Sequence, residues 1–203
     1  MKTRAELKAL AKQQIKGKIG ILFLISLVIA IISGAASSIP FASIIVDPAL
    51  MLSTYLIYCK LSSINDYRPE VSETFGGFSN VLGAMRVYWA QALFTFLWTM
   101  LFIIPGIIKG IAYSQAMFIL AENPEIGGRE ALKKSSEMMQ GHKMDYFILS
   151  LSFIGWNILA VLTLGILYIW LAPYISATQA NFYQSIKPVD FNFTPENEEF
   201  QTA

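Results

Sequence analysis

Three long regions of this 203-residue chain contain almost no Asp, Glu, Lys, Arg or His. The first covers 28 residues from Ile19 to Val46, and the third covers 41 residues from Tyr146 to Ile186. Between them, the second covers 87–108 and resumes over 110–121 after a single lysine. A helix needs about 20 apolar residues to cross the hydrocarbon layer of a bilayer. Because backbone polar groups in lipid must be paired within their own segment, these stretches predict transmembrane helices.

Turn-forming residues interrupt each apolar region. They are the segment 34–40 followed by Asp47-Pro48, then Pro105-Gly106, and finally Thr163-Leu164-Gly165. Gly and Pro at such positions end helices and form turns. We therefore predict an all-α fold, a polytopic transmembrane helical bundle of about six spans arranged as three helical hairpins, plus amphipathic cytoplasmic helices.

The composition agrees with a lipid-facing surface and excludes several functional classes. Charged residues make up 14% of the chain, whereas soluble proteins have about 25%. The net charge of +1 provides no field that attracts nucleic acid, so no nucleic-acid partner is expected. One cysteine and one histidine exclude an internal disulfide and a multi-histidine metal site. The chain also lacks the common catalytic and nucleotide-binding motifs. We expect no cofactor, no metal and no enzymatic activity.

Basic residues gather on one side of the predicted hairpins. Of the 15 Lys and Arg residues, all except Lys109 lie before the first span, between hairpins or after the last span. Cytoplasmic loops are enriched in Lys and Arg, so this distribution places both termini in the cytoplasm. The predicted organisation is an amphipathic cytoplasmic segment, 1–18, a six-span transmembrane domain, 19–186, and a flexible cytoplasmic tail, 187–203. We expect the first span to be retained and not cleaved as a signal peptide.

Two cytoplasmic segments have the spacing of amphipathic helices. In 3–18, apolar side chains recur at helical intervals opposite lysines, at Leu7, Leu10, Ala11 and Ile15. This segment fits either a helix that lies at the lipid headgroups or an ordinary lead-in to the first span. A second helix is predicted near 127–140, after Asn123-Pro124 as a cap followed by proline, and it ends at Gly141. Opposite charges four residues apart support it, at Glu125/Arg129, Glu130/Lys134 and Lys133/Glu137.

Polar side chains inside the predicted spans are candidate functional groups because they are costly in lipid. Asp47, with Pro48 after it, is predicted to cap the second span at the outer interface, and an ion- or proton-binding carboxylate is the alternative. His142 and Lys143 fit either a helix end favoured by the helix dipole or a contact with a lipid phosphate. Five amides are predicted either to hydrogen-bond between helices or to line a polar seam, our candidate binding site: Gln91, Gln115, Asn157, Gln179 and Asn181.

Two weak internal repeats suggest duplicated helical units. Gln115-Ala116-Met117-Phe118 resembles Gln179-Ala180-Asn181-Phe182. Pro48, Ser53 and Tyr58 have the same spacing as Pro173, Thr178 and Tyr183. Transport folds are often built from repeated units, although chance similarity is the alternative and duplication alone does not establish transport.

Several motifs together resemble a known family. They are Trp98 to Gly106, ending in Ile103-Ile104-Pro105-Gly106; Glu122-Asn123-Pro124-Glu125; Ser135 to Lys143, ending in Met139-Gln140-Gly141-His142-Lys143; Phe153-Ile154-Gly155-Trp156; Leu162-Thr163-Leu164-Gly165; and Trp170-Leu171-Ala172-Pro173-Tyr174. Over about residues 4–186, the chain resembles the domain of unknown function 975 family. The resemblance implies a multi-pass helical protein of the bacterial cytoplasmic membrane and supplies no activity. The family pattern has a glycine where this chain has Asp47, so a site built on Asp47 would be particular to this chain.

These observations lead to two functional hypotheses. In the first, a non-enzymatic membrane protein binds or moves a small amphipathic molecule or lipid through the polar seam. In the alternative, the protein is a membrane-embedded assembly or regulatory partner that recognises another protein through its cytoplasmic face. Membrane lipids are the expected partners, and a protein partner or a homo-oligomer belongs to the second hypothesis.

Overall fold

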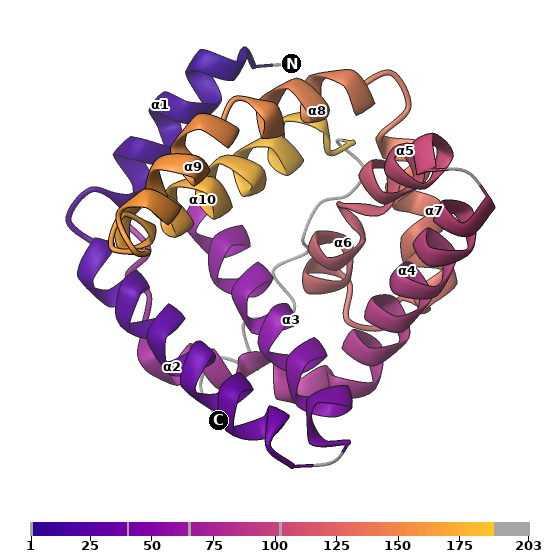
Figure 1. The fold of residues 1–203 in the computed structure, drawn as a ribbon, viewed down its shortest axis with the longest axis horizontal. Coiled ribbons are helices and arrows are strands. Elements are labelled where there is room, and N and C mark those ends of the chain that lie inside the picture. The colour runs from indigo at the N-terminus through magenta and orange to yellow at the C-terminus, as the bar shows by residue number, and fades with distance from the viewer. Residues whose placement is uncertain (1, 40, 65, 102, 189–203) are drawn as a thin grey trace.

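The computed structural model describes residues 2–39, 41–64, 66–101 and 103–188, and within them all regular structure is helical. The elements are α1 (Arg4–Ile15), α2 (Ile19–Ser37), α3 (Ala42–Ser63), the 3-10 helix η1 (Val71–Asn80), α4 (Val81–Leu101), α5 (Ile103–Tyr113), α6 (Ala116–Glu122), α7 (Gly128–Met138), α8 (Lys143–Leu151), α9 (Ile154–Leu162) and α10 (Tyr168–Ile186) (Figure 1). The predicted all-α fold is confirmed.

Three helical hairpins make up most of the molecule, and each has an outer and an inner arm. The outer arms are α2, α4 and α8–α9, and the inner arms are α3, α5–α6 and α10. Every residue of α6 is buried, whereas α2 and α9 expose large apolar side chains such as Ile31 and Leu162. In Figure 1, α2 and α3 run across the direction of α4, α9 and α10. The hairpins are therefore splayed around the centre of the molecule and do not form a parallel bundle.

Four segments of the described chain are long and apolar enough to cross a membrane. They are Ile19–Ser37, Ala42–Ser63, Ile104–Glu122, which combines most of α5 with α6, and Lys143–Leu162, which combines α8 with α9. These segments identify a multi-pass membrane protein. The remaining hairpin arms, α4 and α10, are interrupted by polar side chains such as Arg86 and Gln184. By length and hydropathy, four of the six predicted spans therefore qualify.

The break between α5 and α6 is repaired by a side chain from α7. A helix break leaves backbone donors and acceptors unpaired, which is costly in an apolar environment. The hydroxyl of Ser135 donates to the Ala112 carbonyl at 2.7 Å and accepts from the Gln115 backbone N–H at 3.2 Å. Ser135 is completely buried. The contact therefore fixes α7 against the inner arm of the second hairpin.

The helix predicted near 127–140 is α7, with one error at its start. Asn123 does not cap α7, because it ends α6 instead, and α7 begins at Gly128. Gly128 lies so close to α4 that an added Cβ would be 2.6 Å from the Arg86 carbonyl oxygen. Two of the predicted charge pairs form on the outer face, Glu130–Lys134 at 3.2 Å and Lys133–Glu137 at 3.9 Å.

The first helix, α1, packs against the last one. A capping box joins Thr3 and Glu6 at the start of α1. Hydrogen bonds from the backbone and side chain of Thr3 hold the pKa of the Glu6 carboxyl below its usual value. The apolar face of α1 lies against α10, with Leu7, Ala11 and Ile15 buried. The side-chain amides of Gln14 and Asn181 exchange two hydrogen bonds, at 3.2 and 2.6 Å. The apolar face of α1 is thus covered by the protein and not by lipid headgroups.

Helix α3 begins earlier than predicted, and this changes the role of Asp47. The helix starts at Ala42, so Asp47 and Pro48 lie in its second turn and the predicted cap is wrong. The cap position is Phe41, in a left-handed conformation with φ of 66°. The apolar run before Asp47 becomes helical because its backbone groups would otherwise be unpaired in lipid.

The proline inside α3 is compensated by a tryptophan on α4. Pro48 has no N–H, so the carbonyl of Ile44 loses its helical hydrogen-bond donor. The indole Nε1–H of Trp89 donates to this carbonyl at 3.3 Å. An interior proline is therefore accommodated by an interaction between neighbouring hairpins.

Helices α3 and α10 carry the proline repeat in equivalent places. Both prolines, Pro48 and Pro173, are buried inside a helix. Five residues later, the completely buried Ser53 or Thr178 donates to the carbonyl four residues before it, at 3.1 or 2.7 Å. A buried tyrosine follows after five more residues, at Tyr58 and Tyr183. The second repeat thus corresponds to a shared local structure in two inner helices that pack together.

The 3-10 helix η1 approaches α3 through a glycine. The Gly77 backbone N–H donates to the Ser53 hydroxyl at 2.8 Å. A Cβ added to Gly77 would lie 2.0 Å from the Ala49 carbonyl oxygen, whereas one added to Gly76 would meet only Leu56, at 3.8 Å. We expect Gly77→Ala to destabilise the protein by about 2–3 kcal/mol through overpacking, and Gly76→Ala to have little effect. Thermal unfolding in detergent measures both, and equal melting temperatures would contradict the contact.

The bond from Trp89 to the Ile44 carbonyl makes a second prediction, which a double-mutant cycle tests. Trp89→Phe removes the indole donor and should cost about 1 kcal/mol. In a Pro48→Ala background, the backbone N–H of residue 48 again donates to the Ile44 carbonyl. Trp89→Phe should therefore no longer cost the free energy of the lost indole hydrogen bond. Equal effects of Trp89→Phe in the two backgrounds would show that the indole bond does not compensate for the proline.

Candidate binding cavity

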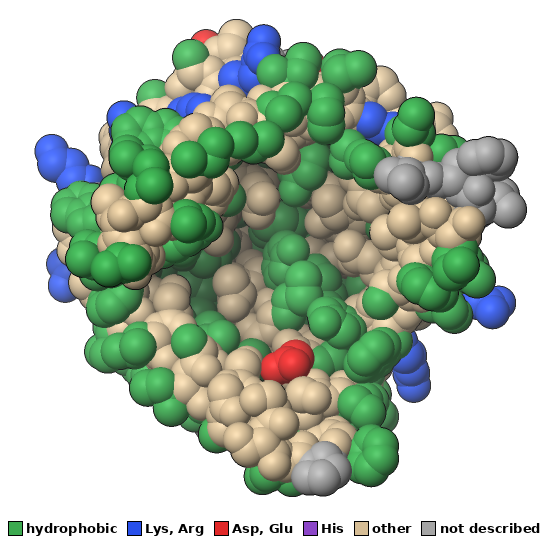
Figure 2. Space-filling model, in the orientation of Figure 1, with side chains coloured by type: hydrophobic (Ala, Val, Ile, Leu, Met, Phe, Trp, Pro, Cys, Tyr) green, Lys and Arg blue, Asp and Glu red, His purple; other side chains and the backbone are tan. Residues whose placement is uncertain are grey.

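A cavity of about 220 Å³ lies between the three inner helices. Its lining comes from one inner arm of each hairpin: Met51, Thr54, Tyr55 and Tyr58 on α3, Phe118 on α6, and Ser176 and Gln179 on α10. Figure 2 shows this face of the molecule hollowed at its centre, with hydrophobic side chains around the hollow. The splayed packing of the hairpins thus creates a shared cavity.

The cavity wall is mainly aromatic, with a few polar groups. The rings of Tyr55 and Phe118 meet edge to face with centroids 4.4 Å apart. The polar groups include the Tyr58 and Ser176 hydroxyls, and the Thr54 hydroxyl, which donates to the Leu50 carbonyl at 3.0 Å. Gln179 is half-buried, and its amide has no hydrogen-bond partner among the described residues. Few polar groups in a largely apolar wall are typical of a small-molecule site.

Phe118 of the cavity wall also belongs to an aromatic stack that leads to a buried ion pair. The ring of Phe118 stacks on Tyr183 with centroids 5.1 Å apart. The Tyr183 hydroxyl donates to the Glu122 carboxylate at 2.7 Å. Lys187 pairs with the same carboxylate at 2.7 Å, and Gln184 donates to it at 3.1 Å. The Glu122 and Lys187 side chains are only 6% and 13% exposed. These contacts join the C-terminal ends of α6 and α10.

This cluster is not predicted from the sequence, in which Lys187 belongs to the predicted flexible cytoplasmic tail, 187–203. All of that segment except Lys187 and Pro188 lies outside the described residues. Lys187 is in fact held by Glu122. One feature of the sequence indicates that the pair is possible. Glu122 and Lys187 each immediately follow an uncharged stretch, so the predicted topology places both on the same side of the membrane.

The five predicted seam amides do not form one seam. Among them, only Gln179 lines the cavity, and Gln91 lies half-exposed on α4. Gln115 is buried beside α7, where its amide nitrogen donates to Ser114 at 2.7 Å and its oxygen has no partner among the described residues. Asn181 is bound to Gln14. Asn157 bridges the Phe153 carbonyl and the Tyr168 hydroxyl within the third hairpin. The predicted seam is therefore wrong, and interhelical hydrogen bonding describes Asn181 best.

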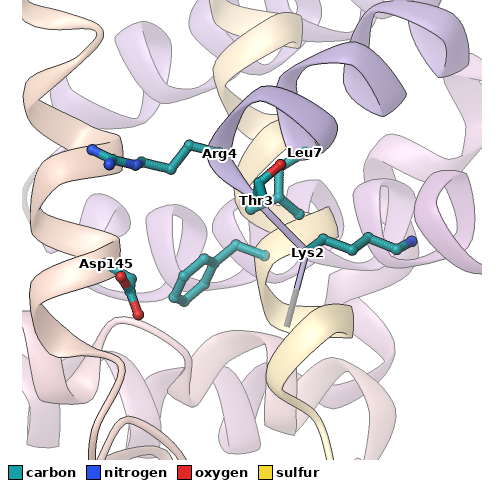
Figure 3. Close-up of a pocket in the computed structure, with 6 residues that line it drawn as sticks. Lys2, Thr3, Arg4, Leu7 and Asp145 are labelled. Carbon is teal, nitrogen blue, oxygen red and sulfur yellow. The ribbon is translucent and has the colours of Figure 1, made fainter.

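A second pocket, of about 340 Å³, lies where the start of α1 meets α8 and α10 (Figure 3). It is lined by Lys2, Thr3, Arg4, Leu7, Asp145 and Phe182. Burial, with the cations of Arg4 and Lys12 nearby, lowers the pKa of Lys8 in the same helix. The predicted headgroup residues, His142 and Lys143, precede Asp145 on the chain but do not line the pocket. Their contact with lipid phosphate stays a prediction.

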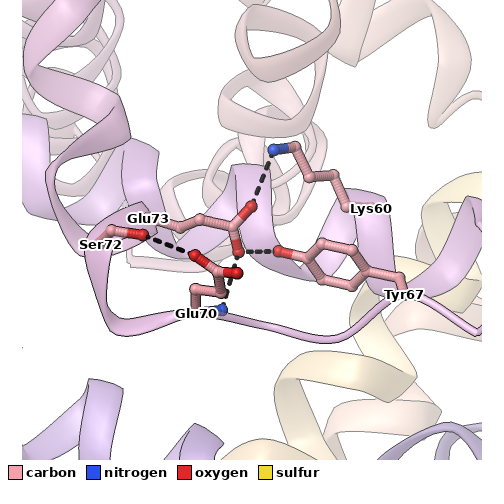
Figure 4. A network of polar contacts seen from close by, with 5 residues as sticks. All are labelled: Lys60, Tyr67, Glu70, Ser72 and Glu73. Atoms are coloured by element: carbon pink, nitrogen blue, oxygen red, sulfur yellow. Dashed lines mark hydrogen bonds and ion pairs between the residues drawn. The ribbon is translucent and has the colours of Figure 1, made fainter. Parts of the chain in front are cut away.

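A polar cluster outside both pockets fixes the connection between α3 and η1 (Figure 4). The Glu73 carboxylate accepts from Lys60 at 2.9 Å, from the Tyr67 hydroxyl, and from the Glu70 backbone N–H at 3.2 Å. Ser72 donates to Glu70 at 3.2 Å. Burial and the neighbouring Glu73 carboxylate raise the pKa of Tyr67. Each member is used in holding the loop, so the cluster is structural.

The comparison with known families concerns the part of the chain that contains the α5–α6 arm, α7 and the third hairpin. Residues 101–190 match the family described as "Protein of unknown function (DUF975)". The predicted resemblance is confirmed over these residues, which include Ser135, Glu122, Tyr183 and Lys187. No curated protein and no solved structure matches the chain. The description of the family gives no activity.

The buried ion pair predicts a large and specific loss of stability. Glu122→Gln leaves the Lys187 ammonium buried without its counter-charge, so we expect a cost of about 3 kcal/mol. Glu137→Gln breaks an exposed pair and should cost less than about 0.5 kcal/mol. Thermal unfolding in detergent compares the two variants. Similar small losses for both would show that the Glu122–Lys187 pair is effectively solvated.

Proposed function

We propose that this protein is a non-enzymatic, six-span protein of the bacterial cytoplasmic membrane that binds a small amphipathic molecule or lipid in the cavity between α3, α6 and α10. The observation that carries the proposal is the lining of this cavity. Aromatic rings and Met51 supply an apolar surface, while the hydroxyls and the Gln179 amide supply polar contacts. Such a wall is complementary to a molecule with an apolar body and a polar group.

The proposed topology is supported by the ends of the inner helices. The C-terminal ends of α6 and α10 meet at the Glu122–Lys187 pair. The Asn80 side chain at the end of η1 donates to the Pro124 carbonyl, directly after α6, at 2.6 Å. The connection before α4 and the connection after α6 therefore lie near each other. These two connections contain the basic residues between the hairpins. The positive-inside rule assigns this side to the cytoplasm, with both termini, and makes α4 and α10 the two further spans.

Photolabelling tests the cavity directly. The protein is reconstituted in nanodiscs with a neutral monoacylglycerol that carries a diazirine in its acyl chain. We expect labelling of peptides that contain 51–58 and Phe118, in addition to labelling of the lipid-facing helices α2 and α9. Ser176→Trp fills the cavity and should reduce the inner labelling at least tenfold. Ser150→Trp, at an exposed position of α8, is the matched control.

The outer helices provide an internal standard for this experiment. Labelling of α2 and α9 reports ordinary contact with lipid and should be unchanged in both variants. If the inner peptides remain unlabelled in the unsubstituted protein, or if Ser176→Trp leaves their labelling intact, the cavity does not bind the amphiphile and the proposal fails.

A further inference from the structure

Asp47 lies on the face of α3 that lines the cavity. The lining residues Met51, Thr54, Tyr55 and Tyr58 follow Asp47 by four, seven, eight and eleven positions. Residues at these intervals share one side of a helix. Asp47 is therefore about one helical turn, or about 6 Å, beyond the cavity wall along α3. Asp47 is the one acidic residue of α3.

The Asp47 carboxylate has no counter-charge in the described part of the chain. Its Oδ1 atom is buried and makes no hydrogen bond, although Asp47 as a whole is half-buried, and the ion pairs formed by the described residues do not include it. A buried carboxylate oxygen is costly unless a positive charge or a hydrogen-bond donor compensates it. The helix does not use Asp47 as a cap, because it starts five residues earlier. The fold itself therefore gives no reason for a carboxylate at this position.

The rest of the cavity has the chemistry that binds organic cations. Tyr55 and Phe118 form an edge-to-face pair in its wall, and Tyr58 adds a third aromatic ring. Aromatic faces attract ammonium and related cations, most strongly where water is excluded. The other lining groups are hydroxyls, an amide and a thioether. The described lining thus contains no Lys or Arg that would repel a cation.

We propose that the ligand of this cavity is an amphipathic organic cation whose charge pairs with Asp47 and whose apolar body lies against Tyr55 and Phe118. This inference rests on the proposed function and adds the charge of the ligand to it. It gives Asp47 a binding role, because the carboxylate and the aromatic wall lie on the same face of α3.

Two probes of nearly the same shape and opposite charge test the proposal. Tetraphenylphosphonium is the cation and tetraphenylborate the anion, and binding of each is measured in nanodiscs with empty nanodiscs subtracted. We expect saturable binding of the cation and at least tenfold weaker binding of the anion. Asp47→Asn should reduce cation binding at least tenfold, and Glu137→Gln, which removes one exposed carboxylate outside the cavity, should leave it unchanged.

Two further variants separate loss of charge from misfolding. Asp47→Glu keeps the charge and should retain binding of tetraphenylphosphonium, whereas Met51→Lys places a cation one turn from Asp47 and should abolish it. Equal binding of the two probes, no binding of tetraphenylphosphonium, or full binding by Asp47→Asn overturns the charge proposal. The neutral monoacylglycerol separates the two proposals, because inner labelling persists if only the charge of the ligand is wrong and is absent if the cavity binds nothing.

Discussion

The fold depends on pairing backbone groups that interrupted helices would otherwise leave exposed to lipid. An unpaired carbonyl or N–H in an apolar medium costs several kcal/mol. Among the described residues, two such interruptions are repaired by a side chain from another helix: Pro48, where Trp89 donates to the freed Ile44 carbonyl, and the α5–α6 break, where Ser135 bonds to both sides. Secondary structure and helix packing are therefore fixed by the same bonds.

The inner helices receive most of these interactions, and this explains where the cavity forms. The interior prolines and buried hydroxyls of α3 and α10 and the broken end of α6 are all features that a lipid-facing helix would not tolerate. The outer arms α2 and α9 carry apolar side chains that suit direct contact with acyl chains. Polar groups thus gather at the centre, where the splayed hairpins leave space and where a ligand with mixed polarity is accommodated.

The sequence predicted the helices and hairpins well because both depend on local properties. Length without charge and the positions of Pro and Gly determine where apolar helices begin and turn. The partners of polar side chains depend instead on distant segments. Asn181 binds Gln14, Gln115 faces α7, and Gln179 alone reaches the cavity, yet all three are amides in similar apolar surroundings.

The predicted cap at Asp47 is wrong because a local signal was overridden. An Asp-Pro pair is a strong signal for the start of a helix, but the preceding apolar residues extended the helix beyond it. The sequence also could not show that Gly77, and not Gly76, lies close to Ala49, because neighbouring glycines differ only in what packs opposite them. Such errors arise wherever tertiary contacts decide between two locally acceptable structures.

The pairing of α1 with α10 has a consequence for biosynthesis. Gln14 and Asn181 are separated by 167 positions, and the buried face of α1 lies against the helix that leaves the ribosome last among the described elements. During translation the apolar face of α1 therefore stays uncovered until α10 has been synthesised. The contact between α1 and α10 forms only after every other described helix has been made, so it is a late step of assembly.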